Sequence, residues 1–287
     1  MLYDTAQAWH DAPQKRILLF GMSGLGKTHI SDMLRRTGKW FHYSVDYRIG
    51  TRYLGERIAD NAKAHAMQVP FLAELLRTDS IYIASNITFS NLAPLSAWLG
   101  KPGDPAKGGL DWDEYRRRQN AHREAEIAAL LDTVPFIDRA EQLYGYPHFV
   151  CDSGGSICEV VDPADPADPV MTALSAHMLP VWIKGSDAHT EELITRFDAA
   201  PKPIYYRPHE LEASWRTYLA ETGAREATVD PDAFIRWAYA RVIKDRQPRY
   251  EAMAKWGVTV SADDVARVRG PEDLEELVSG AIVRREL

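Results

Sequence analysis

Cysteine is scarce in this 287-residue sequence, which has only two, Cys151 and Cys158. Two cysteines cannot build the several disulfides of a small secreted scaffold, so reduced thiols and a cytoplasmic location are expected. The sequence also lacks a run of about 18 apolar residues, so no membrane span is predicted. Its first residues lack a basic segment followed by an apolar one, so no signal peptide is predicted.

An excess of positive charge is also missing. The sequence has 34 Lys and Arg against 41 Asp and Glu, a formal net charge of −7. General nucleic-acid binding needs a basic surface, so that class of partner is disfavoured, although net charge does not exclude a local basic cleft. The hydrophobic fraction of 45% is ordinary for a folded protein, and the length suits one large domain or two small ones.

Short apolar runs alternate with helical patterns along the chain. Strands are expected at 15–20, 40–45, 148–151, 179–184 and 257–260. Helices are expected at 28–36, 46–66, 111–131 and after the fourth strand, where Ser186 or Asp187 is the cap. This alternation predicts an α/β fold with a central parallel five-stranded sheet flanked by helices. The long stretch at 62–147 is predicted to be a largely helical insertion between the second and third strands of a single domain, 1–287.

One motif indicates the chemistry. Residues 21–28 read Gly-Met-Ser-Gly-Leu-Gly-Lys-Thr, which fits G-x-x-x-x-G-K-[ST] between a predicted strand and a predicted helix. The glycines let successive backbone N–H groups point at phosphate oxygens, and the helix start adds its positive dipole end. Lys27 is expected to reach the β- and γ-phosphates of ATP, and the Thr28 hydroxyl to bind Mg²⁺. The predicted nucleotide-binding residues are Gly21, Met22, Ser23, Gly24, Leu25, Gly26, Lys27, Thr28 and His29.

The motif at 21–28 is a phosphate-binding loop, or P-loop. It predicts the fold of a P-loop NTPase but does not separate kinases from ATPases or GTPases. The sequence has no Asn-Lys-x-Asp guanine motif, which favours adenine. An acidic residue is needed at the end of a second buried strand, to hold the water shell of the metal. Asp152 follows the apolar run 149–151 and is the candidate, whereas Asp187 lies too far past its strand. The alternative for Asp152 is a helix cap or a turn residue.

With these residues the chain resembles the P-loop small-molecule kinases, most nearly the shikimate kinase and gluconate kinase group. Asp46 follows the second strand directly, and its counterpart in that family touches the acceptor hydroxyl. The turn Asp-Ser-Gly-Gly-Ser at 152–156 resembles the glycine-rich turn that lines the family's substrate pocket. The resemblance therefore implies substrate contacts for Asp46, Gly154 and Gly155.

The resemblance continues near the C-terminus, with departures. Residues 246–250, Arg-Gln-Pro-Arg-Tyr, resemble the family's Arg-x-Pro-Leu-Tyr segment, whose arginine binds an anionic substrate; this role falls on Arg246. The family's lid Arg-Pro pair reads Lys202-Pro203 here, so Arg196 or Arg207 is expected to supply the lid cation. The resemblance covers roughly 14–60 and 148–265, and it leaves the middle of the chain without a counterpart.

Several polar residues allow two interpretations. Asp46 is either the base that takes the acceptor proton or a cap of the next helix. Arg48 and Arg52 lie four residues apart, so they either share a helix face that binds an anionic acceptor or are solvated charges. The arginines at 116–118 and 123 are more typical of a solvated helix face than of a phosphate clamp.

The leading prediction is an ATP- and Mg²⁺-dependent kinase that transfers the γ-phosphate to a small anionic acceptor. Lys27, Asp46 and Arg196 are its predicted catalytic residues, and Thr28 and Asp152 its metal-binding residues. Two alternatives stay open. One is a regulatory ATPase that hydrolyses ATP to control a partner, and the other is a kinase that acts on a macromolecule through the arginines at 116–123.

Overall fold

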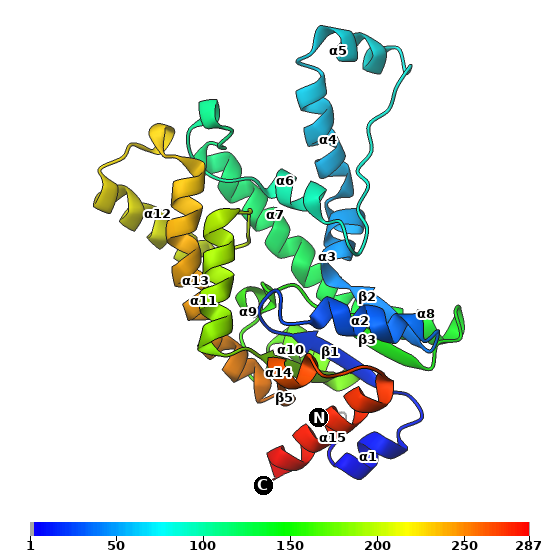
Figure 1. The fold of residues 1–287 in the computed structure, drawn as a ribbon. Coiled ribbons are helices and arrows are strands. Elements are labelled where there is room, and N and C mark those ends of the chain that lie inside the picture. The colour runs from blue at the N-terminus through cyan, green and yellow to red at the C-terminus, as the bar shows by residue number, and fades with distance from the viewer. Residues whose placement is uncertain (1–2, 287) are drawn as a thin grey trace. The chain divides into compact units, whose positions relative to one another are not determined.

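Five parallel strands form the centre of the protein. A computed structural model describes residues 3–286 (Figure 1). The strands are β1 (Arg16–Phe20), β2 (Trp40–Ser44), β3 (His148–Asp152), β4 (Leu179–Lys184) and β5 (Val258–Ser261). They pair in the order β2-β3-β1-β4-β5, and every pair is parallel. The five predicted strands and the parallel sheet are therefore confirmed, with ends that differ by at most one residue.

Strand β1 lies in the middle of the sheet, and its apolar run explains why. Four of its five residues, from Ile17 to Phe20, are buried. Leu19 pairs with Asp152 of β3 on one side and with Val181 of β4 on the other. A strand covered on both faces needs side chains that are apolar on both faces, which an uninterrupted apolar run supplies.

Helices cover both faces of the sheet. Helix α2 (Lys27–Arg36) connects β1 to β2, and α10 (Pro169–His177) lies in the connection from β3 to β4. These two connections run toward opposite edges of the sheet, so right-handed crossovers place α2 and α10 on opposite faces. Helix α8 (Thr133–Gln142) packs against α10, and α15 (Pro271–Glu286) packs against α1 (Ala6–Asp11) and β5. The part of the chain that contains the sheet has four further helices. They are α9 (Ile157–Val160), α11 (Asp187–Ala199), α14 (Ala262–Val265) and most of α13 (Pro231–Ala254).

The chain divides into two compact units. The first contains the sheet and comprises the residues up to Val45, Ile127–Pro201 and the residues from Arg236 onward. The second comprises Asp46–Glu126 and Lys202–Ile235. It thus combines part of the predicted 62–147 insertion with a segment from much later in the chain. The prediction of one domain with an insertion stays a prediction.

The second unit is helical. Its elements are most of α3 (Val45–Arg48), a π-helical turn (Ile49–Tyr53), α4 (Gly55–Ala66), α5 (Pro70–Arg77), α6 (Ala93–Leu99), most of α7 (Trp112–Leu131), α12 (Pro208–Thr222) and two short 3₁₀ turns (Pro105–Lys107 and Glu226–Thr228). The π-helical turn interrupts the helix expected at 46–66. Within this unit, α4 and α5 extend away from α6 and α7 (Figure 1). Trp112 and Trp215 stack with ring centroids 4.6 Å apart, which joins the two sequence segments of the unit.

Two structural findings concern the expectations about cysteine and membrane spans. Both cysteines are buried and free of disulfide bonds, and burial raises the pKa of the Cys158 thiol to about 12. In the described part of the chain, no helix is both long and apolar enough to cross a bilayer.

Candidate active site

The phosphate-binding motif lies at the carboxyl end of β1. Helices that follow β1 and the neighbouring β3 leave the sheet on opposite faces, so a crevice opens beyond the ends of these two strands. Residues 21–26 connect β1 to α2 at this crevice, and residues 153–156 follow β3 at the same edge of the sheet. Ligands of open α/β sheets bind at this kind of crevice.

The loop after β1 needs glycine at its turning points. Gly21, Gly24 and Gly26 have φ angles of 135°, 81° and 99°, a region that side chains with a Cβ rarely adopt. Gly26 is the residue that caps α2, and it has no side chain to occupy the first free N–H groups of the helix. These N–H groups therefore remain available to an anion.

Lys27 lies inside the loop that precedes it. Its ammonium donates hydrogen bonds to the backbone oxygens of Gly21 and Met22, each at 2.8 Å, and the side chain is buried. The next residue, Thr28, is exposed in the first turn of α2. The loop therefore surrounds one cation and presents one hydroxyl beside it, as the motif predicts for a phosphate-binding loop.

Asp152 is the last residue of β3 and is 7% exposed. It pairs in register with Leu19 of β1 and with Ser44, the last residue of β2. The Nε2 atom of His42 lies 3.8 Å from Oδ2 of Asp152, beyond hydrogen-bond distance. Asp152 is thus a strand residue and not the helix cap that the sequence left as an alternative.

The glycine-rich turn after β3 packs directly on the phosphate-binding loop. A Cβ placed on Gly155 would lie 3.0 Å from the Oγ atom of Ser23 and 3.8 Å from Nη1 of Arg246. Ser153 secures the start of this turn, because its hydroxyl donates a hydrogen bond to the backbone oxygen of Leu19 at 2.9 Å. Gly155 is therefore required for a close approach that brings Ser23 and Arg246 to one place.

A buried cluster of charges lies beside this turn. Glu159 of α9 is 3% exposed and accepts hydrogen bonds from two arginines of α13. The Nε atom of Arg246 donates to it at 2.8 Å and Nη1 of Arg249 at 2.5 Å. Burial by itself would lower the pKa of the Arg246 guanidinium, but the adjacent Glu159 carboxylate raises that pKa above its ordinary value. Glu159 thus joins two guanidinium groups of α13 in one buried cluster.

Arg196 of α11 also reaches the phosphate-binding loop. A Cβ placed on Gly24 would lie 2.8 Å from its Nη2 atom, so the guanidinium lies against the loop backbone. The side chain remains 58% exposed, and its ion pair with Glu192 is long, at 3.9 Å. A long arginine on an exposed helix face next to the loop has the freedom that a lid cation requires.

The remaining predicted residues belong to the second unit. Asp46 lies two residues after the end of β2, in the first turn of α3, and is half-buried. Arg48 ends α3 and its guanidinium lies 5.9 Å from the ring centre of Tyr53. Arg52 lies in the π-helical turn and is exposed. Lys202 and Arg207 precede α12 in the same unit.

The arginines at 116–118 pair with acidic neighbours. Arg116 lies 3.1 Å from Glu212, and Arg117 lies 2.9 Å from Glu114. Arg118 also pairs with Glu114, at 2.7 Å. Because their charges are compensated, these residues do not form a free cationic surface, which weakens the alternative of a macromolecular acceptor.

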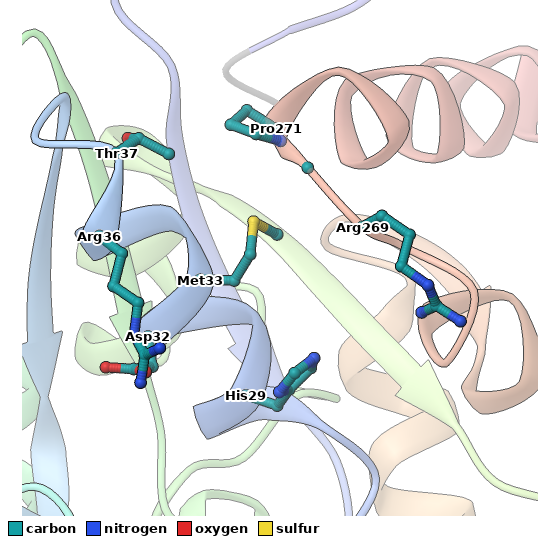
Figure 2. A pocket seen from close by; sticks show the side chains of 8 residues that line it. His29, Asp32, Met33, Arg36, Thr37, Arg269 and Pro271 are labelled. Carbon is teal, nitrogen blue, oxygen red and sulfur yellow. The ribbon is translucent and has the colours of Figure 1, made fainter.

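A cavity of about 410 Å³ lies beside α2, in the first unit. Figure 2 shows His29 and Met33 of α2 on one side of it and Arg269 on the other. The lining residues are His29, Asp32, Met33, Arg36, Thr37, Arg269, Gly270 and Pro271. Those from α2 recur at helical spacing, so one face of the helix that begins at Lys27 forms a wall of the cavity.

One residue of the site was not predicted from the sequence. Glu159 lies in the apolar segment Ile157–Val160, and a lone carboxylate there is the only sequence signal of a buried ion pair.

The parallel sheet, the glycine-rich loop after its central strand and the helix that begins at Lys27 define the α/β fold of the P-loop NTPases. No family model matches the chain, and no curated protein matches it in sequence. Among solved structures, a shikimate kinase from Bacteroides thetaiotaomicron is similar with a TM-score of 0.37 and 15% identity, over 95% of this chain and 99% of that chain. Similarity at this level does not transfer an activity or a substrate.

Proposed function

We propose that this protein is a kinase that uses ATP and Mg²⁺ to phosphorylate a small anionic acceptor. The observation that carries the proposal is the cluster of Glu159, Arg246 and Arg249 at the turn that contacts Ser23, which places an arginine side chain beside the phosphate-binding loop. A guanidinium group beside the phosphate-binding loop is suited to hold an anionic acceptor next to the transferred phosphate.

The nucleotide is assigned to the loop and to the cavity beside α2. The N–H groups of residues 21–28 and the Lys27 ammonium bind the phosphates, and the nucleoside extends past His29 into the cavity between α2 and residues 269–271. Support comes from the cavity volume of about 410 Å³, which lies within the usual range for small-ligand pockets. The Met33 side chain offers an apolar contact for a base there, as Figure 2 illustrates.

The residues present fit a magnesium ion. Thr28 and Asp152 supply oxygen donors, which a hard cation prefers, and Mg²⁺ normally completes its coordination with water and substrate phosphates. Among residues 3–286, no group of three or more His, Cys, Asp or Glu side chains forms a self-sufficient metal site. The ion would neutralise charge on the β- and γ-phosphates.

Transfer then needs little covalent participation by the protein. A bond forms between the acceptor oxygen and the γ-phosphorus while the bond from that phosphorus to the β-phosphate oxygen breaks. The acceptor hydroxyl proton passes to the Asp46 carboxylate, and Arg246 holds the anionic group of the acceptor. Lys27 and Arg196 stabilise the charge on the phosphoryl oxygens.

The experiment measures ADP release from MgATP by the full-length protein, with and without a panel of small hydroxy acids. We expect one acid or more to stimulate ADP release and to become phosphorylated, as detected by mass spectrometry. Lys27→Ala should abolish turnover. Lys39→Ala is the matched control, because Lys39 is exposed next to the amino-terminal end of β2, at the opposite edge of the sheet.

Two variants separate the assigned roles. Asp46→Asn should retain ATP affinity while phosphoryl transfer falls, and an unchanged transfer rate would contradict its role as base. Arg246→Lys should raise the KM for the acceptor more than the KM for ATP. ATP hydrolysis that no small acid stimulates would overturn the kinase proposal and favour the regulatory ATPase.

A further inference from the structure

A tyrosine of α13 holds the glycine-rich turn that follows β3. Tyr250 is 0% exposed, and its hydroxyl donates a hydrogen bond to the backbone oxygen of Gly155. The start of the same turn is held separately, by the hydrogen bond from the Ser153 hydroxyl to the backbone of β1. Tyr250 therefore reaches in from a distant segment and fixes the part of the turn that meets the phosphate-binding loop.

The ring of Tyr250 packs on two strands of the sheet. Its centroid lies 6.4 Å from that of Phe20, the last residue of β1, and 6.4 Å from that of Trp182 in β4. Phe20 directly precedes Gly21, where the phosphate-binding loop begins. One side chain thus packs on the end of the central strand and holds, through its hydroxyl, the turn after the neighbouring strand β3.

The turn that Tyr250 holds also lies beside Arg246. A Cβ on Gly155 would lie 3.0 Å from the Oγ atom of Ser23 and 3.8 Å from Nη1 of Arg246. Arg246 precedes Tyr250 by four residues, so the two side chains leave the same face of α13 one turn apart. A shift of the turn would therefore change its distance both from the phosphate-binding loop and from this arginine.

The Tyr250 hydroxyl remains a hydrogen-bond donor at ordinary pH. Burial raises the pKa of Tyr250 well above its ordinary value of 10.0, so the phenol keeps its proton. The backbone oxygen of Gly155 can only accept a hydrogen bond. Removal of the hydroxyl would therefore remove this bond, while the ring could keep its place against the two strands.

We propose that Tyr250 is a positioning residue, which holds the turn at Gly155 against the phosphate-binding loop and so sets where the anionic acceptor binds beside Arg246. This role rests on the kinase activity proposed above, and Tyr250 acts on the acceptor only through the turn. The phosphate-binding loop has its own support, because the Lys27 ammonium bonds two of the loop's backbone oxygens. Loss of the Tyr250 hydroxyl should therefore weaken acceptor binding and leave nucleotide binding nearly unchanged.

The first test compares Tyr250→Phe with the wild-type protein and with Tyr3→Phe, using an acid that the panel above identifies. Tyr3 is the matched control, because its hydroxyl also donates to a backbone oxygen, that of Gln14 at 2.8 Å, before the amino-terminal end of β1. We expect Tyr250→Phe to raise the KM for the acid about fivefold or more, with the KM for ATP and the affinity for ADP within about twofold of wild type. Tyr3→Phe should leave all three unchanged. Both variants should lower the melting temperature, since each loses a hydrogen bond to the backbone.

A second test determines whether Tyr250 acts through the turn. Gly155→Ala should also raise the KM for the acid, because the added Cβ would press on the Oγ atom of Ser23. If both substitutions displace the same turn, the double variant should raise this KM by clearly less than the product of the two single effects. Effects that multiply would show that the two residues act independently and would overturn the role of Tyr250.

The outcomes are distinguishable. A wild-type protein that phosphorylates an acid, with a Tyr250→Phe variant of unchanged KM for that acid, would overturn the role of Tyr250 alone. Equal rises in the KM for ATP and in the KM for the acid would indicate a general loosening of the fold and would also overturn it. A wild-type protein that phosphorylates no acid of the panel would overturn the proposed function, and the role of Tyr250 with it.

Discussion

A buried histidine in the second unit makes stability depend on pH in a calculable way. His122 of α7 stacks on Tyr205, with ring centroids 5.2 Å apart, and its Nδ1 atom lies 3.7 Å from Glu126, beyond hydrogen-bond distance. Burial lowers the pKa of His122 from 6.5 to about 4. Since the folded pKa is below the unfolded one, the unfolded chain binds more protons between these values, and stability rises with pH in that window.

The magnitude follows from the two pKa values. The pKa of His122 differs between 6.5 in the unfolded chain and about 4 in the folded protein. At about 1.4 kcal/mol per pKa unit, this difference corresponds to about 3 kcal/mol of the free energy of unfolding. This contribution is complete above pH 6.5 and is lost as the pH falls toward 4. By pH 5, about 2 kcal/mol of it should already be lost.

The assay is urea unfolding of wild type, His122→Gln and His65→Gln at about pH 5, 6 and 7. Glutamine does not titrate, so the free-energy gap between wild type and His122→Gln should change by about 2 kcal/mol from pH 7 to pH 5, to the disadvantage of wild type. His65 is exposed on α4, and its variant should follow wild type at every pH. A gap between wild type and His122→Gln that is the same at all three pH values would refute the reasoning.

Three further predictions concern stability, each measured by urea unfolding. Glu159→Ala leaves two arginines around a missing carboxylate and should cost about 3–5 kcal/mol; a loss below about 1 kcal/mol would contradict the buried ion pair. Asp168 caps α10 by accepting two backbone hydrogen bonds, so Asp168→Ala should cost about 1–2 kcal/mol, and no loss would show that the cap is dispensable. A Cβ on Gly257 would lie 1.9 Å from the backbone oxygen of Pro180, so Gly257→Ala should cost about 3 kcal/mol, and wild-type stability would contradict this close approach.

Local patterns predicted the elements well where the pattern is short and complete. The apolar run before Gly21 and the glycine-rich segment after it are both encoded within about a dozen consecutive residues, and the structure has β1, the loop and α2 there. The helix expected at 46–66 was less accurate, because the π-helical turn at Ile49–Tyr53 has no distinct pattern of its own.

The candidate site is a different case, because its parts come from distant segments. Glu159 and Arg246 are 87 residues apart in the chain, and each is unremarkable among its neighbours. The resemblance to small-molecule kinases pointed to Arg246, but the carboxylate that pairs with it comes close only when α9 and α13 are packed together.

The sequence by itself determined the class of the protein. Hydrophobic runs specify strands and a glycine-rich motif specifies a phosphate-binding loop, since both depend on interactions among residues close in the chain. Only the tertiary structure decided which strand ends meet, and it placed β1 between β3 and β4 so that the turn at Gly155 packs on Ser23. It also joined 46–126 to 202–235 in one unit. These arrangements depend on burial between distant segments, a cooperative property of the whole chain that no local pattern records.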